Sequence, residues 1–199
     1  MKKTHDLVTI QNLIDQNLIS LSTGDEIGKM AYGTGDIPFI RTSDMSNWEL
    51  KIDPKQGVSE DIYNEYKTRQ DVKPEDIFLV RDGTYLVGTS CILSKEDEKI
   101  LFCGGIYKIR IINKKKINPY LLFGLLNMNI KKRQLKSKQF TRDVIDTLGH
   151  RFSEVIIPIP KDYLIQKKVA GQIQNLIWQK QKLREEQKSI RNYIQFLKN

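Results

Sequence analysis

The sequence has few of the residues that build metal sites and disulfides. Its two cysteines, Cys91 and Cys103, lie twelve positions apart without a CxxC pair, and its only histidines are His5 and His150. No usual His/Cys zinc spacing is available, and both cysteines are expected to be free core thiols. The shortage of histidine also excludes His-based nucleophilic catalysis, unless His150 acts alone.

Long hydrophobic runs are also missing. No apolar run approaches the roughly 20 residues that span a bilayer, and residues 1–6 (MKKTHD) are not followed by the apolar core of a signal peptide. We therefore expect a cytoplasmic protein with no membrane partner and no metal. The 199 residues, 39% of them hydrophobic, suit one domain of ordinary size with an appendage.

Acidic residues are absent from the most basic part of the chain. Residues 110–142 contain ten basic side chains, whereas the rest of the sequence is nearly neutral, with 23 basic and 24 acidic residues. Such a stretch is typical of a surface that contacts a phosphate backbone, although a merely solvated basic face is the alternative. The ten residues are Arg110, Lys114, Lys115, Lys116, Lys131, Lys132, Arg133, Lys136, Lys138 and Arg142.

The hydrophobic pattern predicts an α+β fold. Thr9, Ser59 and Asn118 are each placed to cap a helix, and Pro119 suits a first helical position. Runs of β-branched and aromatic residues separated by Gly and Asp predict several strands. A Pro-x-Pro sequence at residues 158–160 ends the compact part. The expected strands cover residues 37–40, 77–80, 85–93, 100–103 and 106–112.

The last part of the chain, residues 161–199, reads as one long helix after a domain of residues 1–160. It has no Pro and one Gly, and its apolar residues follow a heptad seam. A helix of this length would be roughly 50 Å long. We expect it to pair in a coiled coil rather than fold back on its own domain. The seam consists of Val169, Ile173, Leu176, Lys180, Leu183, Gln187, Ile190, Ile194 and Leu197.

Motifs for catalysis are incomplete. Residues 33–35 (GTG) lack the third glycine of a dinucleotide loop, and residues 118–120 (NPY) lack the second proline of an adenine methyltransferase loop. Asp76 together with residues 97–99 (DEK) would suit a metal-dependent nuclease, but a charged loop that faces water is the simpler interpretation. Trp48 is expected to be a packing residue.

Four stretches, in order, resemble the target-recognition domains of specificity subunits in type I restriction–modification systems. The first, residues 35–47 (GDIPFIRTSDMSN), resembles the signature near the start of such a domain. The second, residues 73–84 (KPEDIFLVRDGT), resembles the motif in which a strand leads into Arg-x-Gly. Residues 119–122 (PYLL) resemble the helix after the sheet, and residues 157–160 (IPIP) resemble the passage into the spacer helix.

The resemblance implies a β-rich target-recognition domain followed by a coiled-coil spacer helix, and a noncatalytic function. Such a domain reads one half of a bipartite double-stranded DNA target. The implied partners are an adenine-specific DNA methyltransferase, which would bring S-adenosylmethionine, and in some complexes a restriction subunit. This chain itself would need no cofactor. Full-length family members carry two recognition domains and two spacer helices, so homodimerisation through residues 161–199 would restore the symmetry.

The candidate DNA-binding residues come from two sources. The turn ends of the matched motifs contribute Arg41, Thr42, Ser43, Arg81, Thr84 and Tyr85, although Arg41 and Arg81 could instead pair with Asp44 and Asp82. The basic stretch contributes Lys131, Lys132, Arg133, Lys136, Lys138 and Arg142 as phosphate contacts.

Three alternatives remain open at this stage. The chain could be a coiled-coil adaptor that does not read DNA, or a metal-dependent nuclease. It could also form mixed pairs that inhibit or redirect another specificity subunit. Residues 147–152 (TLGHRF) look more like recognition segments that accompany methyltransferases of related restriction systems, which leaves the type of defence system open.

Overall fold

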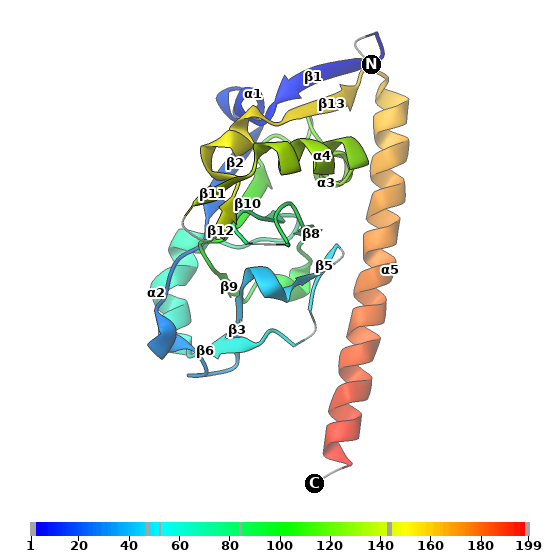
Figure 1. Cartoon of the computed structure of the whole chain (residues 1–199). Coiled ribbons are helices and arrows are strands. Elements are labelled where there is room, and N and C mark those ends of the chain that lie inside the picture. Colours follow the sequence, from blue (N-terminus) through cyan, green and yellow to red (C-terminus); the bar gives the residue numbers. More distant parts are fainter. Residues whose placement is uncertain (1–2, 47, 52, 84, 143–144, 198–199) are drawn as a thin grey trace.

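The computed structural model describes residues 3–46, 48–51, 53–83, 85–142 and 145–197. It is an α+β domain with a long C-terminal helix along one side (Figure 1). The central antiparallel sheet has the order β2-β10-β7-β8. Its strands are β2 (Ile19–Thr23), β10 (Ile106–Ile111), β7 (Ile77–Val80) and β8 (Ser90–Ile92).

A second, three-stranded sheet has the order β6-β3-β9 and mixes directions, because β3 pairs antiparallel with β6 and parallel with β9. Three two-stranded ribbons complete the domain. The strands of the second sheet are β3 (Ile37–Ile40), β6 (Gln56–Val58) and β9 (Leu101–Phe102). The ribbons are β1 (His5–Thr9) with β13 (Ile156–Pro160), β4 (Met45–Ser46) with β5 (Glu49–Leu50), and β11 (Phe140–Arg142) with β12 (Ile145–Thr147).

The predicted helix starts are confirmed by their caps. The Thr9 side chain accepts a hydrogen bond from the Asn12 amide, the Ser59 side chain accepts one from Ile62, and Asn118 caps the helix that begins at Pro119. The helices are α1 (Ile10–Asp15), α2 (Glu60–Gln70), α3 (Pro119–Leu126), α4 (Asn129–Lys138) and α5 (Tyr163–Phe196), with short 3₁₀ turns η1 (Lys29–Ala31), η2 (Thr42–Asp44), η3 (Lys95–Asp97) and η4 (Gly149–Glu154).

Strand β7 lies at the centre of the core, and all four of its side chains are therefore buried. Ile77 and Leu79 pack with α1, α3 and α5 on one face, whereas Phe78 and Val80 pack toward the second sheet on the other. This continuous apolar run is what a strand covered on both faces requires.

The strand expected over residues 85–93 is longer than the strand that forms there. Only Ser90–Ile92 form β8, and the residues before it make a turn in which Gly88 has φ +86°. The Pro-x-Pro segment forms β13, but in a two-stranded ribbon with β1 rather than inside a larger sheet. Prolines are tolerated there because a ribbon has no central strand whose amides must all donate.

Buried charges hold the end of α2 against the central sheet. Arg110 on β10 donates to both carboxylate oxygens of Asp76, at 2.7 Å each, and to Asp71 at 2.5 Å. Lys108 donates to the carbonyl oxygens of Gln70 and Asp71. The Arg110 hydrogen bond lowers the pKa of Asp71, and burial lowers the pKa of Lys108. Arg110, from the basic stretch, therefore has a structural role.

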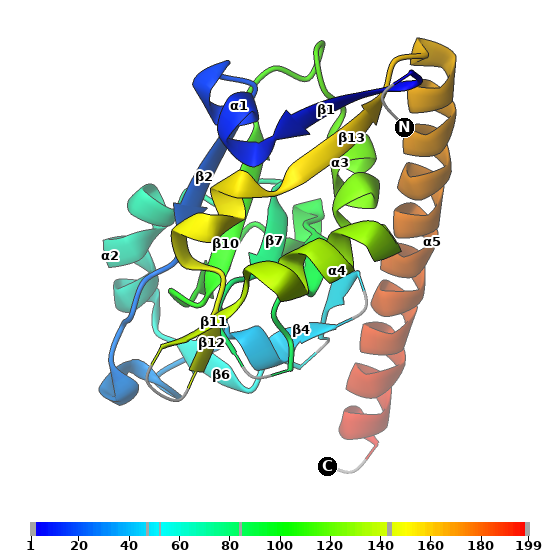
Figure 2. The same ribbon diagram turned by 45° about the horizontal axis from the view of Figure 1, so that its top comes forward.

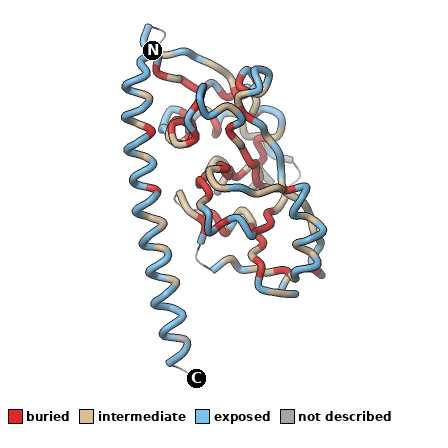
Figure 3. Tube along the Cα trace, turned by 180° about the vertical axis from the view of Figure 1, so that it is seen from behind, coloured by how far each residue is buried: buried red, intermediate tan, exposed pale blue. Residues whose placement is uncertain are grey.

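The prediction that the long helix does not fold back on its domain was wrong for its first half. Ala170 and Ile177 of α5 are 4% and 3% exposed and belong to the main core. Gly124 permits this close approach, since a Cβ there would lie 2.1 Å from Cδ1 of Ile173. The C-terminal end of α5 extends past the domain (Figure 2). The buried positions of α5 lie in its first half, and its C-terminal half is largely exposed (Figure 3).

Candidate nucleic-acid interface

A groove forms where three segments that are distant in sequence meet. One wall is the segment around η2 and the β4–β5 ribbon, another is the turn before β8, and the third is α4. Its volume is about 860 Å³. Among the described residues, the lining includes three lysines and no Asp or Glu. The polar and charged residues of the lining are Ser43, Ser46, Lys51, Tyr85, Thr89, Ser90, Asn127, Lys132, Lys136 and Gln139.

Helix α4 presents its cations to this groove because its apolar face is anchored inside. Leu135 is 1% exposed and packs against Gly88, where a Cβ would come within 3.0 Å of its Cδ1. Lys132 and Lys136, one helical turn apart, line the groove and are exposed. Because Gly88 has no Cβ, its turn can approach Leu135 of α4 closely, and Tyr85 of this turn, which is 94% exposed, lines the same groove as the two lysines.

The opposite wall contains Ser43 at its rim. The ammonium of Lys51 donates to the Ser43 carbonyl oxygen at 2.5 Å, which ties the β4–β5 ribbon to the turn η2. Asp44 is 2% exposed and accepts from the backbone amide of Arg41 at 3.0 Å. The Asp44 carboxylate also lies 3.7 Å from the Arg41 Nε. Arg41 therefore pairs with Asp44, one of the two roles the sequence left open for it.

Arg81 has a similar internal partner. Its guanidinium donates to both oxygens of Asp82, at 2.6 to 3.0 Å, and lies over the Tyr107 ring. This hydrogen bonding raises the pKa of Arg81. Asp82 also accepts from the Thr147 hydroxyl at 2.5 Å and forms a bridge with that residue. Arg81 and Asp82 thus attach the β11–β12 ribbon to the end of β7.

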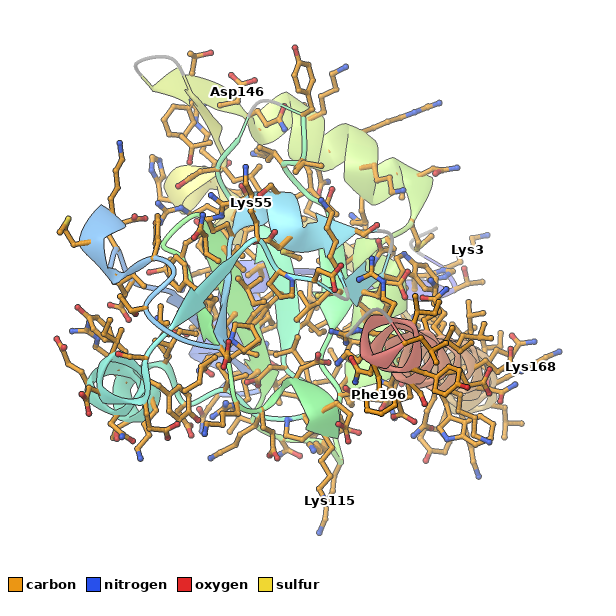
Figure 4. The ribbon with its side chains drawn as sticks, turned by 90° about the horizontal axis from the view of Figure 1, so that it is seen from below. Lys3, Lys55, Lys115, Asp146, Lys168 and Phe196 are labelled. Atoms are coloured by element: carbon orange, nitrogen blue, oxygen red, sulfur yellow. The ribbon has the colours of Figure 1, made fainter. Side chains whose placement is uncertain are left out.

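The basic stretch does not form one continuous face. Lys131 is 3% exposed and its ammonium lies 3.4 Å from the Gln134 side chain, so the structure withdraws it from the surface. Lys138 pairs with Glu154, and Lys114 pairs with Glu75 at 2.5 Å. Lys115 projects from the side of the domain opposite α4 (Figure 4). Burial lowers the pKa of Lys131.

Of the predicted DNA-binding residues, the groove brings together Ser43, Tyr85, Lys132 and Lys136. Arg133 is exposed on the same helix, and Thr42 is half-buried beside Ser43. Thr84 and the side chain of Arg142 lie outside the described part of the chain. Sequence reasoning missed Lys51, Asn127 and Gln139, because no motif singles out these isolated polar residues.

Two carboxylates of the nuclease alternative, Asp76 and Asp97, are paired with arginines. Asp76 is 1% exposed and receives Arg110, as described above. Asp97 is 4% exposed, accepts from Ser94 at 2.7 Å, and pairs with Arg184 of α5 at 2.7 Å. Within the described ranges, no group of three or more His, Cys, Asp or Glu side chains could hold a metal ion. Cys91 and Cys103 are free thiols, and burial raises the pKa of both.

The predicted dimerisation seam on α5 is divided between two faces. Ile173 and Val169 pack against the main core, and Lys180 pairs with Glu49 at 3.0 Å, so these three face the domain. Gln187 lines a groove between α5 and the β4–β5 ribbon. The remaining apolar seam residues are exposed: Leu176 (43%), Leu183 (59%), Ile190 (58%), Ile194 (47%) and Leu197 (65%).

By its fold and its groove, the chain belongs to the class of mixed α+β proteins with a lysine-lined groove and a long C-terminal helix. The sequence family narrows this class. Residues 26–191 match the type I restriction modification DNA specificity domain, and the chain therefore belongs to that noncatalytic family. The family and fold that the sequence motifs predicted are confirmed.

Solved structures share the fold. The S subunit of a type I restriction–modification system from M. genitalium aligns with a TM-score of 0.58 and 12% identity, over 84% of this chain and 37% of that one. The HsdS subunit from Thermoanaerobacter tengcongensis aligns with a TM-score of 0.53 and 14% identity, over 93% and 40% of the two chains.

A third structure, from work on assembly and conformational transition of the type I R-M system, gives a TM-score of 0.58 and 13% identity, over 96% and 43%. This chain thus spans about two fifths of the length of the solved chains it matches. A comparison with curated proteins finds no match. Within the described residues, no helix is both long and apolar enough to cross a membrane.

Proposed function

We propose that this chain recognises one half of a bipartite double-stranded DNA target for a type I-like restriction–modification complex. The observation that carries the proposal is the groove, in which Lys51, Lys132 and Lys136 converge from two distant segments and no acidic residue lies among the described lining residues. Its Ser43, Gln139 and Tyr85 side chains supply donors and acceptors of the kind that direct reading of base edges requires.

The contacts divide by chemistry. Lys132, Arg133 and Lys136 on the exposed face of α4 are suited to phosphates, which position a protein without specifying sequence. Ser43 and Tyr85 also line the groove and are suited to bases, whereas the Asn127 amide nitrogen already donates to the Ser90 hydroxyl and to the Phe123 carbonyl oxygen, at 2.8 Å each. We retain Thr42, Thr84 and Arg142 as candidates, and we remove Lys131 because it is buried.

The exposed apolar residues of α5 support pairing with a second copy of this chain. Residues 1–160 would form the recognition domain and residues 161–199 the spacer. Leu176 and Leu183, one heptad apart, and Ile194 and Leu197 further along the helix are exposed, whereas Ile190 lines the groove between α5 and the β4–β5 ribbon. Two copies related by a two-fold axis would hold two grooves at a constant separation and read a palindromic site.

The proposed partner is a DNA methyltransferase that modifies adenine and binds S-adenosylmethionine, with a restriction subunit in the complete complex. This proposal follows from the family, whose description joins DNA specificity to restriction and modification. This chain would recognise the DNA sequence, and the partner would methylate the base. Base modification requires a flipped base in a dedicated pocket.

Selection from a randomised duplex library tests the function, using the purified chain with and without the methyltransferase. Enrichment of two short half-sites at one spacing is the expected result, and a palindrome indicates a homodimer. A single asymmetric motif would replace the homodimer with a mixed pair of specificity chains. If neither preparation enriches any sequence, the chain is an adaptor and the proposal fails.

A further inference from the structure

The two halves of α5 are held to the domain by different forces. Its first half is anchored by apolar contacts, in which Ala170 and Ile177 enter the core and Ile173 reaches Gly124. Beyond Ile177, the described residues of α5 form three ion pairs with the domain. These pairs are Lys180–Glu49 at 3.0 Å, Arg184–Asp97 at 2.7 Å, and Arg191–Asp53.

A hollow separates the second half of α5 from the domain. Its volume is about 630 Å³, and it lies between the β4–β5 ribbon with its following loop and the helix residues Gln187, Ile190 and Arg191. Lys180–Glu49 and Arg191–Asp53 are partly or fully exposed, whereas Arg184–Asp97 is largely buried. The exposed pairs allow adjustment that a close-packed interface does not, because packed cores rearrange discretely whereas exposed pairs are weak and adaptable.

The β4–β5 ribbon belongs to both surfaces. Ser46 and Lys51 line the DNA groove and also this hollow. Trp48 lines the groove and also the narrow contact with Ile177, and its ring meets Phe123 of α3 edge to face at a centroid distance of 5.1 Å. Trp48 has φ 71°, a costly conformation for a bulky residue that often marks a functional constraint.

We propose that the β4–β5 ribbon, through Trp48 and Glu49, sets the angle between the DNA groove and α5 and so determines the spacing between the two half-sites. The second half of α5 would pivot at Trp48, next to the buried Ile177. The Glu49–Lys180 and Asp97–Arg184 pairs would fix the angle of that half relative to the domain. These side chains are positioning residues, which act on the target through α5. The inference rests on the proposed function, in which paired helices separate two grooves.

The geometry makes the spacing sensitive to this angle. From Ile177 to Phe196 the helix extends about 29 Å at ~1.5 Å per residue. A tilt of about 10° moves its far end by roughly 5 Å, which is close to one and a half base pairs at ~3.4 Å each. Loss of one ion pair is therefore expected to blur the spacing by one or two base pairs without changing the half-site sequence.

A charge swap in the full-length chain tests the inference. Glu49→Lys and Lys180→Glu each place like charges together, and the double variant restores the pair in reverse. In selection from a library of bipartite sites, we expect each single variant to broaden the distribution of spacings and the double variant to narrow it again. Affinity of the double variant, which keeps the net charge, for a duplex with one half-site should change less than twofold, because neither side chain lines the groove.

Glu60→Lys is the matched control, since it breaks the exposed Lys99–Glu60 pair of 2.7 Å on the far side of the domain. It should keep the wild-type spacing. If both single variants also keep it, the inference is overturned while the proposed function stands. If the wild-type chain enriches no bipartite site, the proposed function fails and this inference falls with it.

Discussion

The basic residues of this chain differ in what their charges do. Arg110 is committed to Asp76 and Asp71, Lys138 to Glu154, and Lys131 is buried. Lys132 and Lys136 remain exposed in the groove. A cation that already has a carboxylate partner, or that is buried, gains little from a phosphate, so the count of charges overstates the binding surface.

Neutralising the groove lysines should weaken DNA binding regardless of sequence. In Lys132→Gln/Lys136→Gln, each lost phosphate contact should reduce the slope of log affinity against log salt by about 0.9. Equilibrium titration of a target and a scrambled duplex at several salt concentrations measures both effects. Lys115→Gln/Lys116→Gln is the control, because it removes the same number of positive charges on the opposite side of the domain. A steep slope that survives in the groove variant would move the DNA-binding face elsewhere.

At the scale of elements, α5 is both part of the domain and an appendage. Its contact with α3 depends on Gly124, which leaves space for Ile173. Gly171 lies in the first half of α5 itself, and a Cβ built on it would have no neighbouring atom within 4 Å. The two glycines therefore serve different purposes, although each lies within a helix.

Substitution of these two glycines should have opposite effects on stability. Gly171→Ala should stabilise the chain by up to about 1 kcal/mol, because alanine is the better helix former and meets no neighbour. Gly124→Leu should destabilise it by about 1–3 kcal/mol, because it overpacks the α3–α5 contact. Thermal unfolding followed by circular dichroism measures both, with shifts of roughly 2–4 °C per kcal/mol. Equal shifts would contradict the close packing of α5.

At the scale of the whole molecule, the apolar residues that the domain leaves uncovered form a line along α5. Leu176, Leu183 and Ile194 are each at least 43% exposed. A line of this kind is costly for a solitary helix in water and favourable between two helices. Pairing through it would leave both grooves outside the helix pair, where a duplex can reach them.

A charge in this line should prevent self-association. Leu183→Lys places an ammonium without a partner in the proposed helix pair, and we expect the solution mass measured by light scattering to fall to that of one chain. Glu185→Lys is the control, because two residues along a helix turn it by about 200° to the opposite face. An unchanged mass in Leu183→Lys would count against pairing through this face.

The sequence by itself determined the class of fold, the helix caps, the long terminal helix and the family. These features depend on local rules: Thr9, Ser59 and Asn118 satisfy helix amides within four residues, and the family motifs are contiguous. The pairing of Arg81 with Asp82 was also open to sequence reasoning, because the two residues are adjacent.

Only the tertiary structure decided which charges face the groove. Residues 110–142 read as one basic surface, yet Arg110 meets carboxylates from more than thirty residues away and Lys115 points to the opposite side. The heptad pattern likewise could not say which residues face the domain, because Ile173 fits either a second helix or Gly124. Contacts between distant segments depend on how the chain packs, and a linear pattern of charge or hydrophobicity does not carry that information.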